Sequence, residues 1–369
     1  MTLPRILVLA TGGTIAGEAG DAMRHDYRPG QVGIEHYLNE AAGLGVAAQF
    51  TGRQIANIGS EDIDASIWSR LHAEIDHAMR DDGVDAVMIG TWPNMHCEVT
   101  CAALEAGKHV MTEARMAMNA KEAHDMLDAS RLKPHLIAQI VPAPSTLDVD
   151  STIQGLIADG YLGEILAVKL RVSNTEGRAN RNDTFADTEA PFHWRQNQLL
   201  SGYNAMSMGI WYEQLMRYVG PASKVSAMTK VCVRQRLDEN GVMRAVSVPD
   251  HINVICQMAC GAQADLSWSS VSGLQKGNEL WLLGTEGTLN LKGAPNVLYG
   301  GRKGDTELSE IPIPAENKGA WRVEEEFINA IRGEEQITRT PFDVGVQYME
   351  FTEAVARSSQ TGQAISLPL

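Results

Sequence analysis

The first residues that could do chemistry form a glycine and threonine turn. The segment Ala10-Thr11-Gly12-Gly13-Thr14 follows an apolar run at residues 5–10. Glycines at a strand end let backbone N–H groups approach an anion, and the Thr14 hydroxyl could attack a carbonyl carbon if a base lay beside it. The spacing G-G-x-x-x-G, ending at Gly17, is not the dinucleotide fingerprint, and no acidic residue follows about 20 positions later at a second strand end. A tight turn without chemistry is an equal alternative.

Further candidates follow two later strand-like runs. Thr91, Trp92, Pro93 and Asn94 come after residues 84–89, and His96 follows within the same turn. His96 would begin a helix, where a capping or packing role competes with ligand contact.

Another pair of candidates follows residues 108–112. Glu113 and Arg115 flank the end of this run, where a role in a cleft competes with that of a solvated pair. Farther along, residues 191–195 combine aromatic and cationic side chains, including His193, which suits either a substrate face or a hairpin anchor.

The elements that would position the first residues alternate between β-branched runs and helical spacing. This alternation predicts a Rossmann-like doubly wound α/β domain over residues 1–142, because parallel strands need crossover helices. The expected strands are residues 5–10, 46–55, 84–89, 108–112 and 135–140. Pro142 and Pro144 then interrupt the pattern, and we expect the domain boundary there.

Residues 143–369 predict an α+β domain with an open, mainly antiparallel sheet. The expected strands cover residues 164–173, 224–235, 251–270 and 278–292, with helices at 151–158, 322–331 and 342–358. Turns at Cys260-Gly261 and Glu286-Gly287 favour antiparallel hairpins. An open sheet face of this size is an expected surface for homo-oligomer formation.

Composition excludes several classes of protein. The 369 residues contain 31 Lys and Arg against 46 Asp and Glu, a formal charge of −15, which disfavours nucleic acid and membrane surfaces as partners. The first apolar run is too short for a signal peptide or a membrane span. Five cysteines without a C-x-x-C motif fit a cytoplasmic protein, and the two C-x-x-x-C pairs predict no metal site.

Three motifs in order make the front of the chain resemble bacterial type II L-asparaginases. They are residues 3–17, 26–33 and 54–62, and the resemblance covers about residues 3–88. It implies that Thr14 is the nucleophile, that Tyr27 activates it, and that Ser60 and Glu61 contact the substrate carboxylate. At residues 89–94, however, the family's second catalytic threonine and its aspartate are missing, and so is the downstream lysine. Residues of this kind act as a unit, so the resemblance implies little amidase activity.

A second resemblance, to the Gfo/Idh/MocA family of NAD(P)-dependent oxidoreductases, covers about residues 83–369. The motifs that carry it are residues 90–96, 102–110, 113–115, 158–164, 284–289, 326–331 and 354–362. It implies NAD or NADP as cofactor and a sugar, polyol or related secondary alcohol as small-molecule substrate. Thr91, Trp92, Pro93, Asn94, His96 and Glu113 would line the nicotinamide side, and Thr11, Gly12 and Gly13 could offer N–H donors to the pyrophosphate.

Two departures affect the chemistry that this resemblance implies. Ala114 occupies the position of the family's lysine, and Trp211 that of its base histidine. Hydride transfer from an alcohol needs a group that takes the hydroxyl proton. The candidates that could replace those residues are Glu113, Arg115, His193, Tyr212 and Glu213.

The two resemblances meet within residues 81–89, which suggests a chimera of two α/β parents. The leading hypothesis is an oxidoreductase of the Gfo/Idh/MocA type. The alternatives are a catalytically inactive scaffold and, less favoured, a remnant amidohydrolase that uses Thr14.

Overall fold

The computed structural model describes most of the chain. The described residues are 3–12, 18–19, 27–28, 33–43, 48–58, 64–173, 185–238, 240–275, 277–293 and 295–369. They form two compact units. Unit 1 comprises Met1–Met116, His124–Val141 and Arg322–Phe342, and unit 2 comprises Ala117–Ala123, Pro142–Trp321 and Asp343–Leu369.

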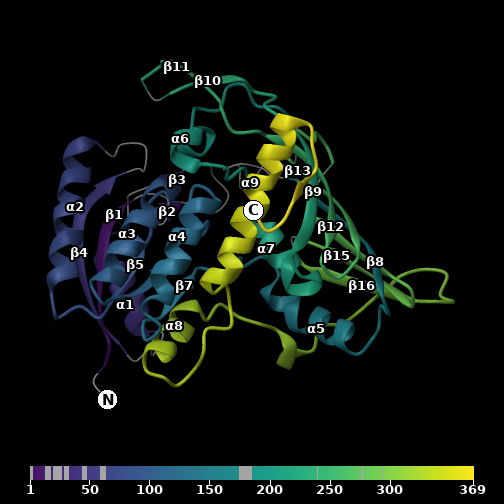
Figure 1. Cartoon of the computed structure of the whole chain (residues 1–369), viewed down its shortest axis with the longest axis horizontal. Helices are drawn as coiled ribbons and strands as arrows, with labels where there is room; N and C mark the ends of the chain where they lie inside the picture. The colour runs from purple at the N-terminus through teal and green to yellow at the C-terminus, as the bar shows by residue number, and fades with distance from the viewer. Residues whose placement is uncertain are drawn as a thin grey trace. The chain divides into compact units, whose positions relative to one another are not determined.

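Unit 1 is built on a parallel sheet whose strand order, in the part of the chain described, is β4-β1-β5-β6-β7 (Figure 1). The strands are β1 (Arg5–Gly12), β4 (Gln49–Ile58), β5 (Ala86–Ile89), β6 (His109–Thr112) and β7 (Ala138–Ile140). Every paired neighbour is parallel, with Ile6 opposite Ala86 and Ile89 opposite Thr112. The expected Rossmann-like doubly wound sheet is therefore confirmed.

Two helices of unit 1 begin at residues that favour a helix N-terminus. The helices of this unit are α1 (Ile34–Gly43), α2 (Ala65–Arg80), α3 (Pro93–Glu105), α8 (Val323–Ile331) and α4 (Ala120–Arg131), of which residues 120–123 belong to unit 2. The Asp64 carboxylate accepts the N–H groups of Ser66 and Ile67 at the start of α2. Pro93 occupies the first turn of α3, where its missing N–H costs nothing.

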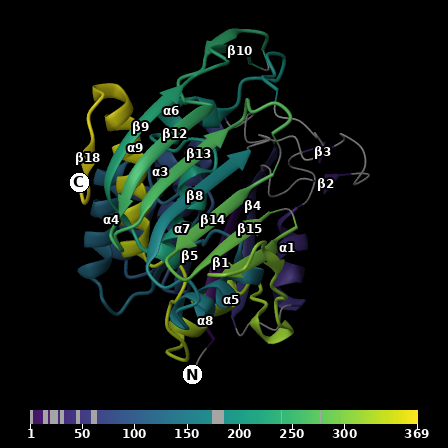
Figure 2. The ribbon, with the colours of Figure 1, turned by 90° about the vertical axis from the view of Figure 1, so that its right-hand side faces the viewer.

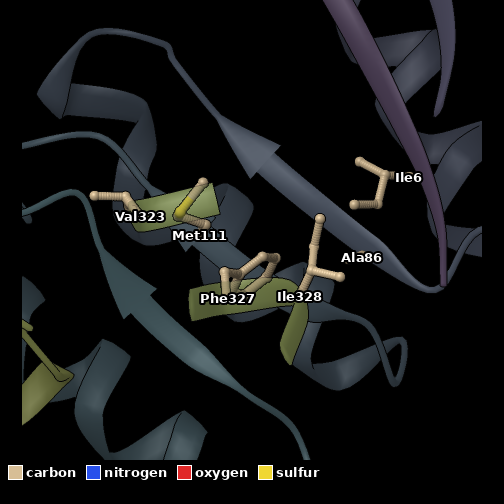
Figure 3. Close-up of a cluster of buried hydrophobic side chains, with 6 residues drawn as sticks. All are labelled: Ile6, Ala86, Met111, Val323, Phe327 and Ile328. Atoms are coloured by element: carbon tan, nitrogen blue, oxygen red, sulfur yellow. The ribbon is translucent and has the colours of Figure 1, made fainter. Parts of the chain in front are cut away.

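A helix from late in the sequence completes the core of unit 1. Val323, Phe327 and Ile328 of α8 pack against Ile6, Ala86 and Met111 from the sheet (Figure 3). Phe327 is fully buried. Unit 1 thus includes residues 322–342, which the sequence placed in the second domain.

Unit 2 is built on a mixed, mainly antiparallel sheet (Figure 2). Its order among the described residues is β17-β16-β15-β14-β8-β13-β12-β9-β18, and only the β13–β8 pair is parallel. The strands are β8 (Ile165–Ser173), β9 (Ala222–Lys230), β12 (His251–Met258), β13 (Gln263–Ser269), β14 (Glu279–Gly284), β15 (Gly287–Lys292), β16 (Val297–Arg302), β17 (Ser309–Glu310) and β18 (Ile365–Ser366). The expected open antiparallel sheet and both hairpins are confirmed.

Helices and two hairpins complete the described structure. Unit 2 has α5 (Leu147–Ala158), α6 (Gln198–Ser201), α7 (Met208–Val219), α9 (Phe342–Thr361), η3 (Trp194–Gln196) and η4 (Ala315–Asn317). The expected strand over residues 224–235 divides, because β10 (Gln235–Leu237) pairs with β11 (Met243–Ala245) instead of continuing β9. In unit 1, β2 (Glu18–Ala19) pairs with β3 (Tyr27–Arg28). Among the described residues, the helices are too short or too polar to cross a bilayer.

Candidate active site

The candidate site of unit 1 lies at the carboxyl ends of its central strands. β5 and β6 end side by side, since Ile89 pairs with Thr112 and the Glu113 N–H donates to the Ile89 carbonyl over 2.9 Å. Open parallel α/β sheets bind ligands at this edge, where the strand order reverses on either side of the first strand. Here that reversal falls between β1 and β5.

The turn after β5 presents an open, partly polar surface. Gly90 is exposed, and a side chain there would meet no atom within 4 Å. Thr91 and Trp92 are half-buried, and Pro93 is buried at the start of α3. Asn94 follows it, and its Oδ1 is buried without a hydrogen-bond partner. An orphaned buried acceptor is costly, so a donor from a ligand or a water would stabilise this atom.

His96 ties this turn to the next one. Its ring is 1% exposed, with Nδ1 2.9 Å from the Arg115 carbonyl oxygen and Nε2 2.9 Å from the Thr91 carbonyl oxygen. Burial lowers the pKa of His96, so the ring is neutral near pH 7 and donates through one nitrogen. Both nitrogens face backbone carbonyls, so His96 lies between the two turns and helps to position them. Direct contact between His96 and a cofactor stays a prediction.

Glu113 is the titratable group that stands out in the turn after β6. Burial raises the pKa of its carboxyl, the Ala114 N–H lowers it, and the charge of Glu324 raises it further. That N–H donates to Oε2 over 3.2 Å. A carboxyl with a raised pKa at a strand end holds its proton more tightly than an exposed one, which suits it to proton transfer.

Arg115 is buried beside Glu113, and its peptide bond with Ala114 is cis. Its carbonyl oxygen faces His96. The structure therefore brings Thr91, Asn94, His96, Glu113 and Arg115 together on neighbouring strand ends of unit 1, as the sequence predicted.

Two candidates in unit 2 have structural roles instead. Tyr212 is fully buried, its ring stacks on Phe351 with 3.6 Å between centroids, and its hydroxyl accepts the Ala222 N–H over 2.7 Å. Burial raises the pKa of this phenol far above its usual range. This environment favours a packing role over proton transfer, because the hydroxyl oxygen already accepts a hydrogen bond and the side chain is shielded from solvent. A catalytic role for Tyr212 stays a prediction, which this environment does not favour.

Glu213 belongs to a buried ion cluster. Its carboxylate accepts the Arg217 guanidinium over 2.7 Å, and Arg217 also contacts Asp150 over 2.6 Å. The Ala143 N–H donates to Glu213, and the Ala143 carbonyl accepts from Arg217, which fixes the start of unit 2. This cluster was not expected from the sequence, although Glu213 and Arg217 have the i, i+4 spacing of a helical ion pair.

His193 caps η3 in unit 2. Its Nδ1 accepts the Arg195 N–H over 3.3 Å, and the His193 N–H donates to Oε1 of Gln196 over 2.9 Å. Burial, followed by the charge of Arg195, lowers the pKa of His193 to about 4. The imidazole is therefore neutral at pH 7, and the capping role gives it a structural function beside any contact with substrate.

Most of the asparaginase-like candidate residues lie outside the described residues of the chain. Gly13, Thr14, Ser60 and Glu61 are not among the described residues. Thr11 and Gly12 are described only as the backbone end of β1, and Tyr27 only as backbone of β3. In a dinucleotide fingerprint, a helix opens directly after the first strand. Here the next described elements after β1 are β2 and β3, and α1 begins at Ile34.

Comparison with known proteins finds two separate likenesses along the chain. Residues 151–290 match the GFO/IDH/MocA C-terminal domain, and residues 5–91 match the asparaginase N-terminal family. The front segment is 41% identical over 75 residues to L-asparaginase 2 of Escherichia coli (strain K12), which is 20% of this chain and 22% of that enzyme. Both resemblances expected from the sequence are confirmed for these segments.

The remainder is similar to sugar dehydrogenases. Levoglucosan dehydrogenase of Pseudarthrobacter phenanthrenivorans is 25% identical over 197 residues, 49% of this chain and 48% of that enzyme. The chain thus spans about half of that relative and less than a quarter of the asparaginase. A solved levoglucosan dehydrogenase in complex with NADH and L-sorbose superposes with a TM-score of 0.72 at 19% identity, covering 99% of each chain. At this identity, the likeness establishes the fold.

Proposed function

We propose that the chain is an NAD(P)-dependent oxidoreductase that acts on a sugar, a polyol or a related secondary alcohol. The observation that carries the proposal is the His96 bridge, which holds the turns after β5 and β6 together with Glu113 and Asn94 on them. The names of the relatives support the same class of reaction, since they include a levoglucosan dehydrogenase and a D-xylose 1-dehydrogenase.

The described residues fit the nicotinamide end of the cofactor. The buried, unpartnered Oδ1 of Asn94 is an acceptor that a carboxamide N–H would satisfy, and a side chain at Gly90, in the same turn, would meet no atom within 4 Å. The adenosine side fits less well among the described residues, because residues 54–58 at the end of β4 contain no acid that could bind a ribose. The Gln54 side chain instead bonds to the Ala10 carbonyl and the Ile34 N–H.

The chemistry divides between the cofactor and the chain. NAD(P), held at the turns after β5 and β6, would supply the acceptor for the hydride of the alcohol carbon. Glu113 takes the hydroxyl proton at Oε1, because Oε2 accepts the Ala114 N–H. The raised pKa of Glu113 makes its carboxylate a stronger base than an exposed one. Arg115 stabilises the oxygen on which negative charge develops, and His96 keeps both turns in place.

The test of this proposal is reduction of NAD or NADP by a panel of sugars and polyols, followed by absorbance of the reduced nicotinamide. We expect turnover with at least one sugar, and its loss in Glu113→Gln. Nucleotide binding without turnover on any member of the panel would contradict the proposed reaction.

Two alternatives remain and have their own readouts. A scaffold of two parents that keeps neither chemistry would bind no nucleotide. A remnant amidohydrolase would release ammonia from asparagine, and Thr14→Ala would abolish that release. The position of the front segment within the parallel sheet of unit 1 is compatible with either.

We also propose that unit 2 forms a homo-oligomer through the outer face of its sheet (Figure 2). This face carries Met228, Ile255 and Trp281 between lysine and carboxylate side chains, and the first two are exposed. A second copy would bury these apolar groups and pair the charges. Light scattering should report an oligomer that Ile255→Lys dissociates, and a monomeric wild type would contradict the proposal.

A further inference from the structure

Two cysteines lie along one side of α3 in unit 1. Cys97 and Cys101 are four residues apart, and a helix has about 3.6 residues per turn, so their side chains project from the same side. Both are half-buried and reduced. They border the helix face that contains the buried Thr100 and Leu104, whereas Glu98 is exposed. The pair is therefore supported by the core and accessible to solvent.

The two thiols interact with each other. The Cys97 thiol donates a hydrogen bond to the sulfur of Cys101, and this bond lowers the pKa of Cys101. Burial and the negative charge of Asp125, from α4, raise that pKa but do not cancel the shift. The thiolate is the form of cysteine that binds metals, so a lowered pKa favours a cation at Cys101. The Asp125 carboxylate favours a cation there as well, because its charge is negative.

The spacing of the pair fits a bridging atom better than a direct bond between the sulfurs. Side chains four residues apart on a helix have Cβ atoms about 5–6 Å apart. A disulfide needs a Cβ–Cβ distance of about 3.5–4.5 Å, so a disulfide between Cys97 and Cys101 would distort α3. An atom bound between the two sulfurs lengthens the link and leaves the helix intact.

The surroundings favour an ion that needs only two ligands. Within the part of the chain that the structure describes, no group of three or more His, Cys, Asp or Glu side chains could hold a metal ion. Zinc takes three or four protein ligands, and Mg²⁺ and Ca²⁺ take oxygen ligands. Thiolates select soft cations, of which Cu(I) is the one that two sulfurs can hold in a linear arrangement.

We propose that Cys97 and Cys101 bind one soft cation of the Cu(I) type between their two sulfurs. Binding releases both S–H protons to solvent and transfers no electron, so it needs no oxidant or reductant. The sequence predicted no metal site at this C-x-x-x-C pair, because no further ligand pair accompanies it, and the proposal revises that expectation for a two-ligand ion. It does not depend on the reaction proposed above, since neither cysteine has a role in that reaction.

The test titrates the reduced full chain with Cu(I) in the absence of oxygen, against a chelator whose colour reports the Cu(I) that it holds. We expect the chain to withdraw one Cu(I) per molecule from the chelator. Zn²⁺ is the second arm and should not displace that Cu(I), because the pair offers too few ligands for it. The proposal is overturned if an excess of the chain withdraws no Cu(I), or if Zn²⁺ displaces it.

Two serine variants and a matched control locate the cation. Cys97→Ser and Cys101→Ser each leave one thiolate, so each should lose the transfer of Cu(I) from the chelator. The control is Cys260→Ser, since exposed Cys260 has the same spacing from Cys256, but Cys256 is buried in β12, where side chains do not follow helical spacing. The control should bind Cu(I) as the wild type does.

Circular dichroism checks that each variant keeps the fold. If a serine variant does not fold, alkylation of the wild type gives the answer, because bound Cu(I) should protect Cys97 and Cys101 from a maleimide but not the exposed Cys260. Uptake of Cu(I) by a folded serine variant, loss of uptake in Cys260→Ser, or equal alkylation of all three cysteines with and without Cu(I) would refute the assignment.

Discussion

The Nδ1 atom of His96 lies 2.9 Å from the carbonyl oxygen of Arg115, and this contact joins the turns after two neighbouring strands. The second nitrogen faces the Thr91 carbonyl at the same distance. A buried imidazole in this position fixes the spacing between the two turns that would receive the nicotinamide. It makes the candidate site a property of unit 1 alone.

Removal of this bridge should affect both binding and stability. His96→Ala leaves two buried carbonyls and a cavity, so we expect a loss of about 2–4 kcal/mol in the free energy of unfolding. Affinity for NADH should fall about tenfold or more, because the turns lose their fixed spacing. Urea unfolding and fluorescence titration measure the two effects. His72→Ala on the exposed side of α2 is the control, and equal behaviour of the two variants would refute the positioning role.

Glu113→Gln should separate chemistry from binding. The amide keeps the size of the side chain but cannot take a proton, so turnover should fall about a hundredfold or more. The affinity for nucleotide should stay within about threefold. The wild type should lose activity as pH falls through the raised pKa of Glu113, because the base must be ionised. The control Glu98→Gln, on the exposed surface of α3, should lose activity at low pH as the wild type does. If Glu113→Gln shows the same loss of activity at low pH, Glu113 is not the base.

The buried ion cluster of unit 2 should be sensitive to loss of its cation. Arg217→Leu leaves Asp150 and Glu213 without their partner, and we expect a loss of about 3–5 kcal/mol. The arginine side chain is 9% exposed in this cluster, whereas Arg171 is 39% exposed beside Glu279. Arg171→Leu should therefore cost less than about 1 kcal/mol in the same urea experiment. Similar losses for both variants would contradict the account of the cluster.

His193 should make the stability depend on pH in the acid range. Its pKa is lowered to about 4 in the folded chain, against about 6.5 in an unfolded one. As pH falls from about 6.5 to about 4, the unfolded chain takes up the proton first, so stability is lost across this window and not below it. His193→Asn keeps a capping oxygen but does not titrate, and should flatten this part of the profile. If the pH profile of stability in His193→Asn has the same slope as the profiles of the wild type and of His72→Asn, this prediction is wrong.

The fold could be predicted well because its signals are periodic. Each expected strand of the parallel sheet overlaps an observed one, and the helix expected at residues 322–331 is α8. The packing of α8 in unit 1 was not predictable. The apolar face that contains Phe327 predicts burial, but helical spacing does not indicate which sheet the helix packs against.

The sequence predicted which residues lie at the candidate site, but not which contacts each of them makes. Sequence spacing placed His96, Glu113 and Arg115 near strand ends, whereas only the structure shows that both ring nitrogens of His96 face backbone carbonyls. The complete burial of Tyr212 was likewise not predictable, since an aromatic hydroxyl in a helix gives no sequence signal of its burial.

The most direct measurement is a titration of the purified chain with NADH and NADPH, followed by nucleotide fluorescence, in the wild type and in Asn94→Leu. The account predicts saturable binding below about 0.1 mM, which corresponds to roughly −5.5 kcal/mol, and weaker binding when the Asn94 amide is lost. Absence of binding at millimolar nucleotide, or equal affinity in the variant, would contradict a nicotinamide site at the turns after β5 and β6.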